Sequence, residues 1–132
     1  MIAVDATVLV RYLTNDDAAQ ALRAQALLGN ADGVFVAKSV LQETESVLRA
    51  VYNLAPQAIR KALLHVCGLP SVAIEDGRAL ARALEVYEQG LDFADALHWA
   101  SSPSAKVFYT FDEKFVRGAT RLGLAVMSAQ SN

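Results

Sequence analysis

The sequence predicts an α/β fold with a small, mostly parallel sheet and about six or seven helices. Short apolar runs of β-forming residues alternate with longer segments of helical periodicity, and turn signals separate them. No repeat, low-complexity segment or long linker divides the chain. With 132 residues, 54% of them hydrophobic, the chain is long enough to bury a core, so we expect one domain over residues 1–132.

The first quarter of the chain predicts a strand, two helices and a second strand. Residues 1–4 are apolar and too few for a helix, which favours a buried strand. Residues 8–13 and the alanine-rich residues 18–28 are expected to be helices, the second ended by Gly29. Residues 34–36 follow an Asp-Gly turn signal and predict another strand.

The next helix is expected over residues 39–52. Ser39 is a candidate N-cap with Gln42 three residues later, which is the pattern of a capping box. Glu43 and Glu45 lie on opposite flanks of the apolar arc on a helical wheel. That arc consists of Val40, Thr44, Val47, Leu48 and Val51.

The helix after this one is expected to begin with Pro56 in its first turn and to end before Gly68. Its buried stripe is Ile59, Leu63 and Val66. Residues 71–74 fit either a short strand or an extended linker.

The rest of the chain continues the alternation of predicted helices and strands. Residues 75–89 predict a helix that buries Leu80, Leu84 and Tyr87, and residues 92–102 predict another. A strand over 107–110, a short helix after Asp112 and a last strand over 124–126 follow, and we expect residues 128–132 to fray.

Composition restricts the chemistry. The net charge of −2 gives no overall basic field, so a nucleic-acid partner would need a local basic patch or a bound metal. The single cysteine, Cys67, excludes an internal disulfide and a cysteine-based zinc site, and we expect it in the core. No secretory signal or membrane-spanning run is visible, which favours a cytoplasmic protein without a membrane partner.

Four acidic residues stand at positions that favour chemistry. Asp5 ends the strand at 1–4 and Asp112 follows the strand at 107–110. If these were neighbouring parallel strands, both acids would face the crevice where open α/β sheets bind ligands. Glu43 and Asp95 come from two other helical segments, and Asp95 sits three residues after the N-cap candidate Asp92.

Convergence of these acids would require a counter-ion. Two carboxylates about 4 Å apart repel by roughly 4 kcal/mol at an effective dielectric near 20. A cluster should therefore shift its pKa values or hold a divalent cation, and oxygen ligands select Mg²⁺ or Mn²⁺. Glu43 is preferred to Glu45, because Glu45 has Arg49 at i+4 and fits a solvated helix pair.

A basic row follows the last acid. Lys114, Arg117 and Arg121 are spaced i, i+3 and i+7, so they could form one stripe that contacts an RNA backbone, or simply a solvated face. Gly118 is a potential break in this helix.

Several motifs in this order resemble the PIN-domain ribonucleases, specifically the VapC-type toxins of toxin–antitoxin pairs. The resemblance spans nearly the whole chain and implies a three-layer α/β/α fold. It is carried by the opening Val4–Leu13, by Ser39–Glu43 with Val47-Leu48, by Asp92–Leu97 and by Thr110–Phe115.

By this resemblance the catalytic, metal-binding acids are Asp5, Glu43, Asp95 and Asp112. The residues that would support these ligands or cap helices are Thr7, Asp92 and Thr110. The family usually has a hydroxyl residue followed by Asn after the first Asp, where this chain has Ala6-Thr7, and Thr7 would then replace the Asn contact.

The resemblance also implies an activity and partners. It implies a hydrolase, an endoribonuclease dependent on Mg²⁺ or Mn²⁺, which is inhibited by a cognate antitoxin and commonly forms a homodimer. One alternative is a non-catalytic RNA- or protein-binding module of the same fold. The other is a phosphatase of the haloacid-dehalogenase type, which would need a second Asp at the position of Thr7.

Overall fold

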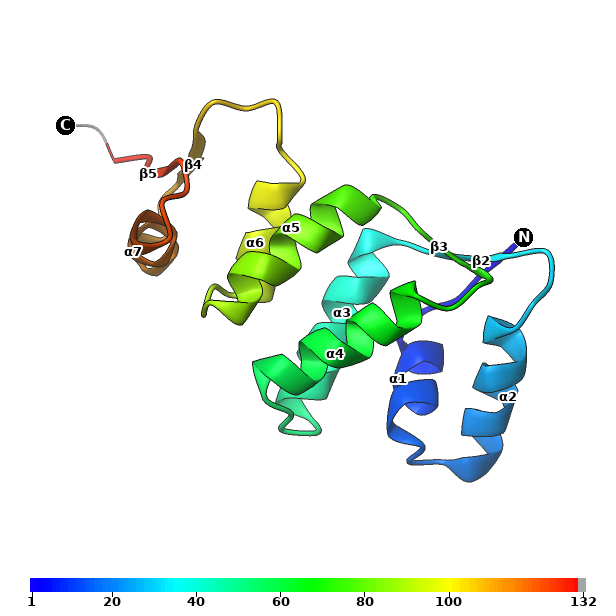
Figure 1. The fold of residues 1–132 in the computed structure, drawn as a ribbon. Helices are drawn as coiled ribbons and strands as arrows, with labels where there is room; N and C mark the ends of the chain where they lie inside the picture. Colours follow the sequence, from blue (N-terminus) through cyan, green and yellow to red (C-terminus); the bar gives the residue numbers. More distant parts are fainter. Residues whose placement is uncertain (131–132) are drawn as a thin grey trace. The chain divides into compact units, whose positions relative to one another are not determined.

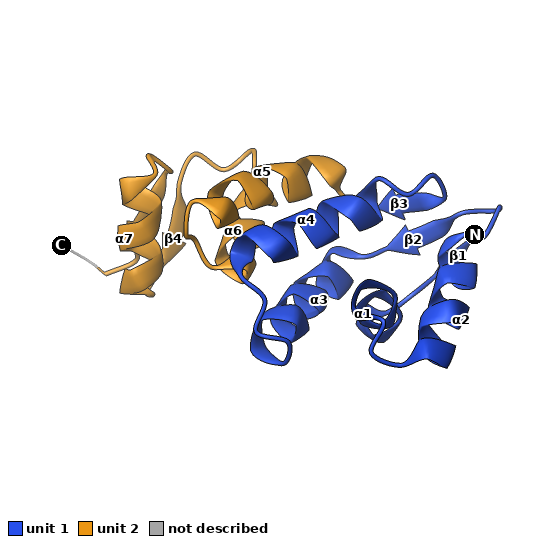
Figure 2. Cartoon of the chain, turned by 60° about the horizontal axis from the view of Figure 1, so that its bottom comes forward, with its two compact units in different colours: residues 1–75 blue, residues 76–132 orange. Residues whose placement is uncertain are grey.

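The computed structural model describes residues 1–130, with seven helices and five short strands (Figure 1). The α/β class, the number of helices and the parallel pairing of strands are confirmed. The chain divides into two compact units, residues 1–75 and residues 76–132 (Figure 2), each described here by itself. That residues 1–132 act as one domain stays a prediction. Residues 131 and 132, part of the expected frayed tail, lie outside the described residues.

Unit 1 contains a three-stranded parallel sheet in the order β1-β2-β3, formed by Ile2–Ala3, Val34–Val36 and Val72–Ile74. Val34 pairs with Ile2 on one side and with Val72 on the other. Val34 and Val36, which lie on the same face of the central strand, are fully buried, whereas Phe35 on the other face is half-buried. Residues 72–74 are therefore a strand rather than a linker.

Four helices complete unit 1: α1 (Ala6–Thr14), α2 (Ala18–Leu28), α3 (Lys38–Ala50) and α4 (Pro56–Cys67). In both views α1 packs beside α2, and α3 packs beside α4 (Figures 1 and 2). The bounds predicted for α2 are confirmed, whereas α1 begins two residues earlier than predicted. Asp5 is its N-cap, and the Asp5 carboxylate accepts a hydrogen bond from the backbone N–H of Val8 at 3.2 Å.

The predicted capping box at Ser39 is wrong. Helix α3 begins at Lys38, its N-cap Ala37 makes no side-chain hydrogen bond, and Ser39 lies inside the first turn. The carboxylate of Glu75, just after β3, instead accepts a hydrogen bond from the backbone N–H of Lys38 at 2.9 Å. A residue distant in sequence therefore supplies the acceptor that the first turn of α3 needs.

The buried face of α3 is rotated from the predicted arc. Leu41, Thr44 and Leu48 are fully buried, but Val51 is 66% exposed and follows the helix end. The Thr44 hydroxyl donates to the backbone carbonyl of Val40 at 2.7 Å, which satisfies this polar group inside the core. In α4 the predicted stripe of Ile59, Leu63 and Val66 is confirmed, since all three are fully buried.

Unit 2 begins with an antiparallel helical pair, α5 (Gly77–Glu88) and α6 (Phe93–Ala100). Gly90 turns the chain between them with φ of +106°, a conformation that favours glycine. The rings of Tyr87 and Phe93 meet edge to face with centroids 5.3 Å apart. The guanidinium carbon of Arg82 lies 4.4 Å from the centroid of the Trp99 ring, a cation–π contact between the two helices.

The second part of unit 2 is a β-α-β segment: β4 (Phe108–Thr110), α7 (Glu113–Arg121) and β5 (Val126–Ser128). The two strands pair in parallel, and Phe115 of α7 packs on Phe108 of β4 with ring centroids 5.6 Å apart. The last strand is shifted two residues from the predicted 124–126. Gly118 does not break α7, which continues to Arg121.

The pairing that would have brought Asp5 and Asp112 to adjacent strand ends is not observed. In the described chain β1 pairs with β2 and β4 pairs with β5, in two separate hydrogen-bonded sheets. Among residues 1–130, none of the helices combines the length and hydrophobicity needed to cross a bilayer.

Leu63→Ala tests the core of unit 1. Leu63 is fully buried, so loss of its side chain should lower the free energy of unfolding by about 2–5 kcal/mol. Leu64→Ala is the matched control, because Leu64 is the next residue of the same helix and is 42% exposed. Urea titration would measure both, and equal losses for the two variants would contradict the assigned face of α4.

Cys67 provides a second test. Cys67 is half-buried, not in the core as expected. This burial raises the pKa of its thiol to about 11, so at pH 8 almost none of it is thiolate. Alkylation by iodoacetamide should be slow in the native protein, should continue to rise up to about pH 11, and should accelerate on unfolding in urea. A native rate at pH 8 equal to that of the unfolded chain would show that the thiol is not shielded.

Candidate active site and nucleic-acid interface

Unit 2 contains a cavity of about 410 Å³ whose lining joins acidic and basic side chains. The acids are Asp92, Asp95 and Asp112, and the bases are Lys114, Arg117 and Arg121. Gly90, Leu91, Phe115 and Gly118 complete the lining. Every predicted site residue of unit 2 except Thr110 therefore lines one cavity.

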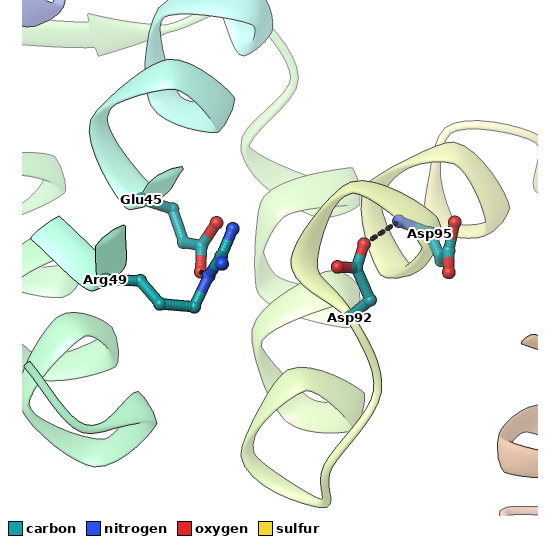
Figure 3. A network of polar contacts seen from close by, with 4 residues as sticks. All are labelled: Glu45, Arg49, Asp92 and Asp95. Carbon is teal, nitrogen blue, oxygen red and sulfur yellow. Dashed lines mark hydrogen bonds and ion pairs between the residues drawn. The ribbon is translucent and has the colours of Figure 1, made fainter. Parts of the chain in front are cut away.

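Two of these acids are fixed as helix N-caps. Asp92 caps α6, and its Oδ1 accepts a hydrogen bond from the backbone N–H of Asp95 at 3.1 Å (Figure 3). Asp112 caps α7, and its Oδ1 accepts from the backbone N–H groups of Lys114 and Phe115 at 3.0 and 3.2 Å. All three capping contacts use the Oδ1 atom of the carboxylate. The Oδ2 atoms take no part in these capping contacts, so Asp92 and Asp112 could each cap a helix and also bind a ligand.

Asp95 is the most perturbed acid of the site. Its side chain is half-buried in the first turn of α6, and desolvation by burial is the largest cause that raises the pKa of its carboxyl. The negative charges of Asp92 and Asp112 raise it further, whereas the charges of His98 and Lys114 lower it. The ionised carboxylate is thus destabilised at the position where a bound cation would relieve it.

Thr110 acts on Asp112 through the backbone. Its hydroxyl oxygen accepts a hydrogen bond from the N–H of Asp112 at 3.0 Å, rather than donating to a carboxylate. This contact fixes the turn between β4 and α7 and so orients the Asp112 cap. The expected supporting role of Thr110 is therefore one of positioning the main chain.

The basic wall comes from one face of α7. Lys114, Arg117 and Arg121 are exposed residues that line the same cavity. Gly118 lies among them, and a Cβ added there would come within 3.2 Å of the Leu91 Cδ1 atom. Glycine in a helix interior costs about 1 kcal/mol relative to alanine, so its role here is to let α7 approach the turn before α6.

Asp5, Thr7 and Glu43 lie in unit 1. Asp5 caps α1 through its Oδ1 atom. Thr7 and Glu43 line a second cavity, of about 300 Å³, together with Arg11, Asp16 and Tyr52. The Tyr52 hydroxyl donates to the carboxylate of Asp16 at 2.9 Å at this cavity. Within unit 1 the structure thus brings Glu43 beside Thr7 rather than beside a second predicted metal ligand.

Glu45 does pair with Arg49, as predicted, but the pair is not fully solvated. The Glu45 Oε2 atom lies 2.9 Å from the Arg49 Nε atom, and the Glu45 side chain is only 4% exposed (Figure 3). A carboxylate buried to this degree needs a cationic partner. Its engagement in this ion pair leaves Glu43, which is exposed, as the candidate ligand on α3.

The donor chemistry of the acids fits a hard dication, since carboxylate oxygens are its preferred ligands. Burial, followed by the negative charges of Asp92 and Asp112, raises the pKa of Asp95. Within either unit, over residues 1–130, no three acidic, histidine or cysteine side chains gather as a ready-made metal site. The three acids of unit 2 line a common cavity without closing around one point.

Four residues that line the cavity were not predicted as part of it: Gly90, Leu91, Phe115 and Gly118. Phe115 was predicted only as part of the Thr110–Phe115 motif, and Gly118 only as a potential helix break. A glycine inside a strongly amphipathic helix, between basic residues, is the signal that could have marked a close approach.

Asp95→Asn should stabilise the folded protein in EDTA-containing buffer. Because the folded-state pKa of Asp95 is raised above its ordinary value of 3.8, the ionised side chain destabilises the native state at neutral pH. This penalty disappears as the pH falls below about 3.8, where the acid is protonated in both states. Thermal unfolding should therefore give a higher Tm for the variant at pH 7 and equal values near pH 3.

The control for this comparison is Glu85→Gln, which removes an exposed carboxylate of α5 in the same unit that does not line the cavity. Its Tm at pH 7 should match the parent protein. An Asp95→Asn variant less stable than the parent at pH 7 would contradict the electrostatic account of the cavity.

Comparison with known proteins identifies the family. No curated protein matches the chain significantly. Among solved structures, VapC20 of Mycobacterium tuberculosis, a toxin that cleaves the sarcin–ricin loop, matches with 18% identity and a TM-score of 0.44 over 89% of this chain and 94% of that one. The PIN domain family matches residues 2–120. The chain therefore belongs to the PIN domain family.

Proposed function

We propose that this protein is a metal-dependent endoribonuclease, the toxin of a type II toxin–antitoxin pair, acting in the cytoplasm. Two observations support the proposal. The chain belongs to the PIN domain family over most of its length, and its resemblance to VapC-type toxins implies RNA cleavage. The single observation that carries the chemistry is the cavity of unit 2, where Asp95 and Asp112 face cationic side chains of α7.

We propose Asp5, Glu43, Asp95 and Asp112 as the catalytic, metal-binding residues, with Thr7, Asp92 and Thr110 in supporting or capping roles. Asp95 and Asp112 are supported by their common cavity and by the charge interactions around Asp95. Asp5 and Glu43 are supported by the family resemblance and by their exposure. Mg²⁺, or Mn²⁺ in its place, is the proposed cofactor.

When bound, the cation would supply Lewis-acid chemistry, acidifying water and withdrawing charge from the phosphate. The protein itself orients the acids and offsets their negative charge. Backbone amides at the starts of α6 and α7 hold the Asp92 and Asp112 carboxylates in place. Lys114 offsets negative charge at Asp95, and so limits the repulsion that a phosphodiester would meet on entering the cavity.

The partners of the protein follow from the same resemblance. We propose that RNA is the substrate, that a cognate antitoxin inhibits the toxin, and that the toxin forms a homodimer. Membership of the PIN family argues against the phosphatase alternative, which also lacked its second Asp.

The proposal is tested by RNA cleavage. The purified protein should cleave total RNA in Mg²⁺ or Mn²⁺ buffer, and EDTA should abolish the activity. Asp95→Asn and Asp112→Asn should each lower the rate by about 10²-fold or more, because cation-dependent charge stabilisation contributes several kcal/mol. Glu85→Gln, the exposed-carboxylate control, should retain full activity.

The same preparation separates the proposal from a non-catalytic module of the same fold. A nuclease should show an increase in Tm on addition of Mn²⁺, which Asp95→Asn weakens. A protein with neither a Mn²⁺-dependent thermal shift nor EDTA-sensitive cleavage would be a binding module, and the enzymatic proposal would be rejected.

A further inference from the structure

The basic residues of α7 form a continuous row on one helix face. Lys114, Arg117 and Arg121 are spaced three and four residues apart, so they lie above one another along the helix. From first to last the row covers about 10.5 Å at 1.5 Å per residue. This is too long for a single phosphate group and suits a ligand with repeated negative charge.

These cations are available for a ligand. Among the described residues, Lys114 and Arg121 make no ion pair within α7 or elsewhere in unit 2, and Arg117 makes only a 4.0 Å contact with Glu113. Both members of that pair are more than 70% exposed, so it contributes little stability. Ion pairs within unit 2 therefore leave the positive charge of the row largely unneutralised.

The row borders a partly open cavity. The volume of about 410 Å³ falls in the range of small-ligand sites and suits a nucleotide-sized group. Leu91 and Phe115 give part of the lining an apolar character, and Gly118 keeps the space between α7 and the Leu91 turn narrow. A sugar or base could pack there while its phosphates meet the cations.

We propose that Lys114, Arg117 and Arg121 bind RNA phosphates that flank the bond cut at the acidic side of the cavity. This inference rests on the proposed function and assigns the row to substrate positioning. Arginine suits this role because its planar fork donates two parallel hydrogen bonds to phosphate oxygens. This local row of positive charge also explains how a chain with a net charge of −2 attracts RNA.

Position along α7 separates Lys114 from the two arginines of the row. Lys114 is near enough to Asp95 to affect its pKa, so it lies at the acidic end. Arg117 and Arg121 extend from there toward the end of the helix. These two arginines are thus positioning residues for the flanking backbone, and their loss should weaken binding more than it slows the chemical step.

The direct test is binding of a labelled single-stranded RNA oligonucleotide to Asp95→Asn protein, in which the RNA stays intact. On that background, Arg117→Gln with Arg121→Gln should weaken the Kd about tenfold at low salt. It should also reduce the slope of log K against log salt by about 1.4, or about 0.7 for each lost phosphate contact on a single strand.

The matched control is Arg78→Gln with Lys106→Gln. Both residues are exposed cations of unit 2 outside the cavity lining, so this variant has the same net charge as the test variant. Its Kd and salt slope should match those of the Asp95→Asn parent. Arg117→Lys with Arg121→Lys should keep most of the slope, and Tm measurements would verify that each variant is folded.

Steady-state cleavage on the background with Asp95 intact gives the second readout. Arg117→Gln with Arg121→Gln should raise KM with kcat unchanged within about twofold. If the unmodified protein cleaves RNA while the test and control variants are indistinguishable in Kd, salt slope and KM, the inference is overturned and the proposed function stands. If the unmodified protein neither cleaves nor binds RNA, both are rejected.

Discussion

The candidate site depends on holding like charges at one cavity without losing the fold. Asp92, Asp95 and Asp112 repel one another, and burial adds to the cost of ionising Asp95. Helix N-termini make this arrangement tolerable. Two of the three carboxylates accept backbone N–H hydrogen bonds as caps, each worth about 0.5–2 kcal/mol, and the helix dipoles favour negative charge there. Lys114, Arg117 and Arg121 of α7 add positive charge to the lining of the same cavity.

Most elements were predictable from sequence where local chemistry decides the structure. Residues 18–28 and 34–36 have the predicted bounds, and Asp92 and Asp112 cap the predicted helices. Each of these features depends on periodicity or on contacts only two to four residues apart. Prediction failed where a distant residue intervened. Ser39 has the right chemistry for a cap, but Glu75 supplies the hydrogen-bond acceptor at the start of α3.

The candidate site likewise has a part that local sequence predicts and a part that depends on long-range contacts. The acidic and basic walls of the cavity in unit 2 come from residues 90–95 and 112–121, and their capping and spacing patterns were readable locally. The grouping of Asp5 and Glu43 with Asp95 and Asp112 depends on long-range placement, which spacing along a chain does not encode. It rests on the family resemblance. The buried state of Glu45 was likewise missed, because an i+4 cation identifies a pair but not its exposure.

Gly118 is a position in the cavity lining where an added side chain would closely approach a neighbour. A methyl group added at Gly118 would lie 3.2 Å from the Leu91 Cδ1 atom, so the Leu91 side chain would have to shift by a few tenths of an ångström. The charged residues of the cavity lining would all remain. A side chain larger than hydrogen at Gly118 would therefore change the shape of the cavity lining while every ionisable group of the lining is kept.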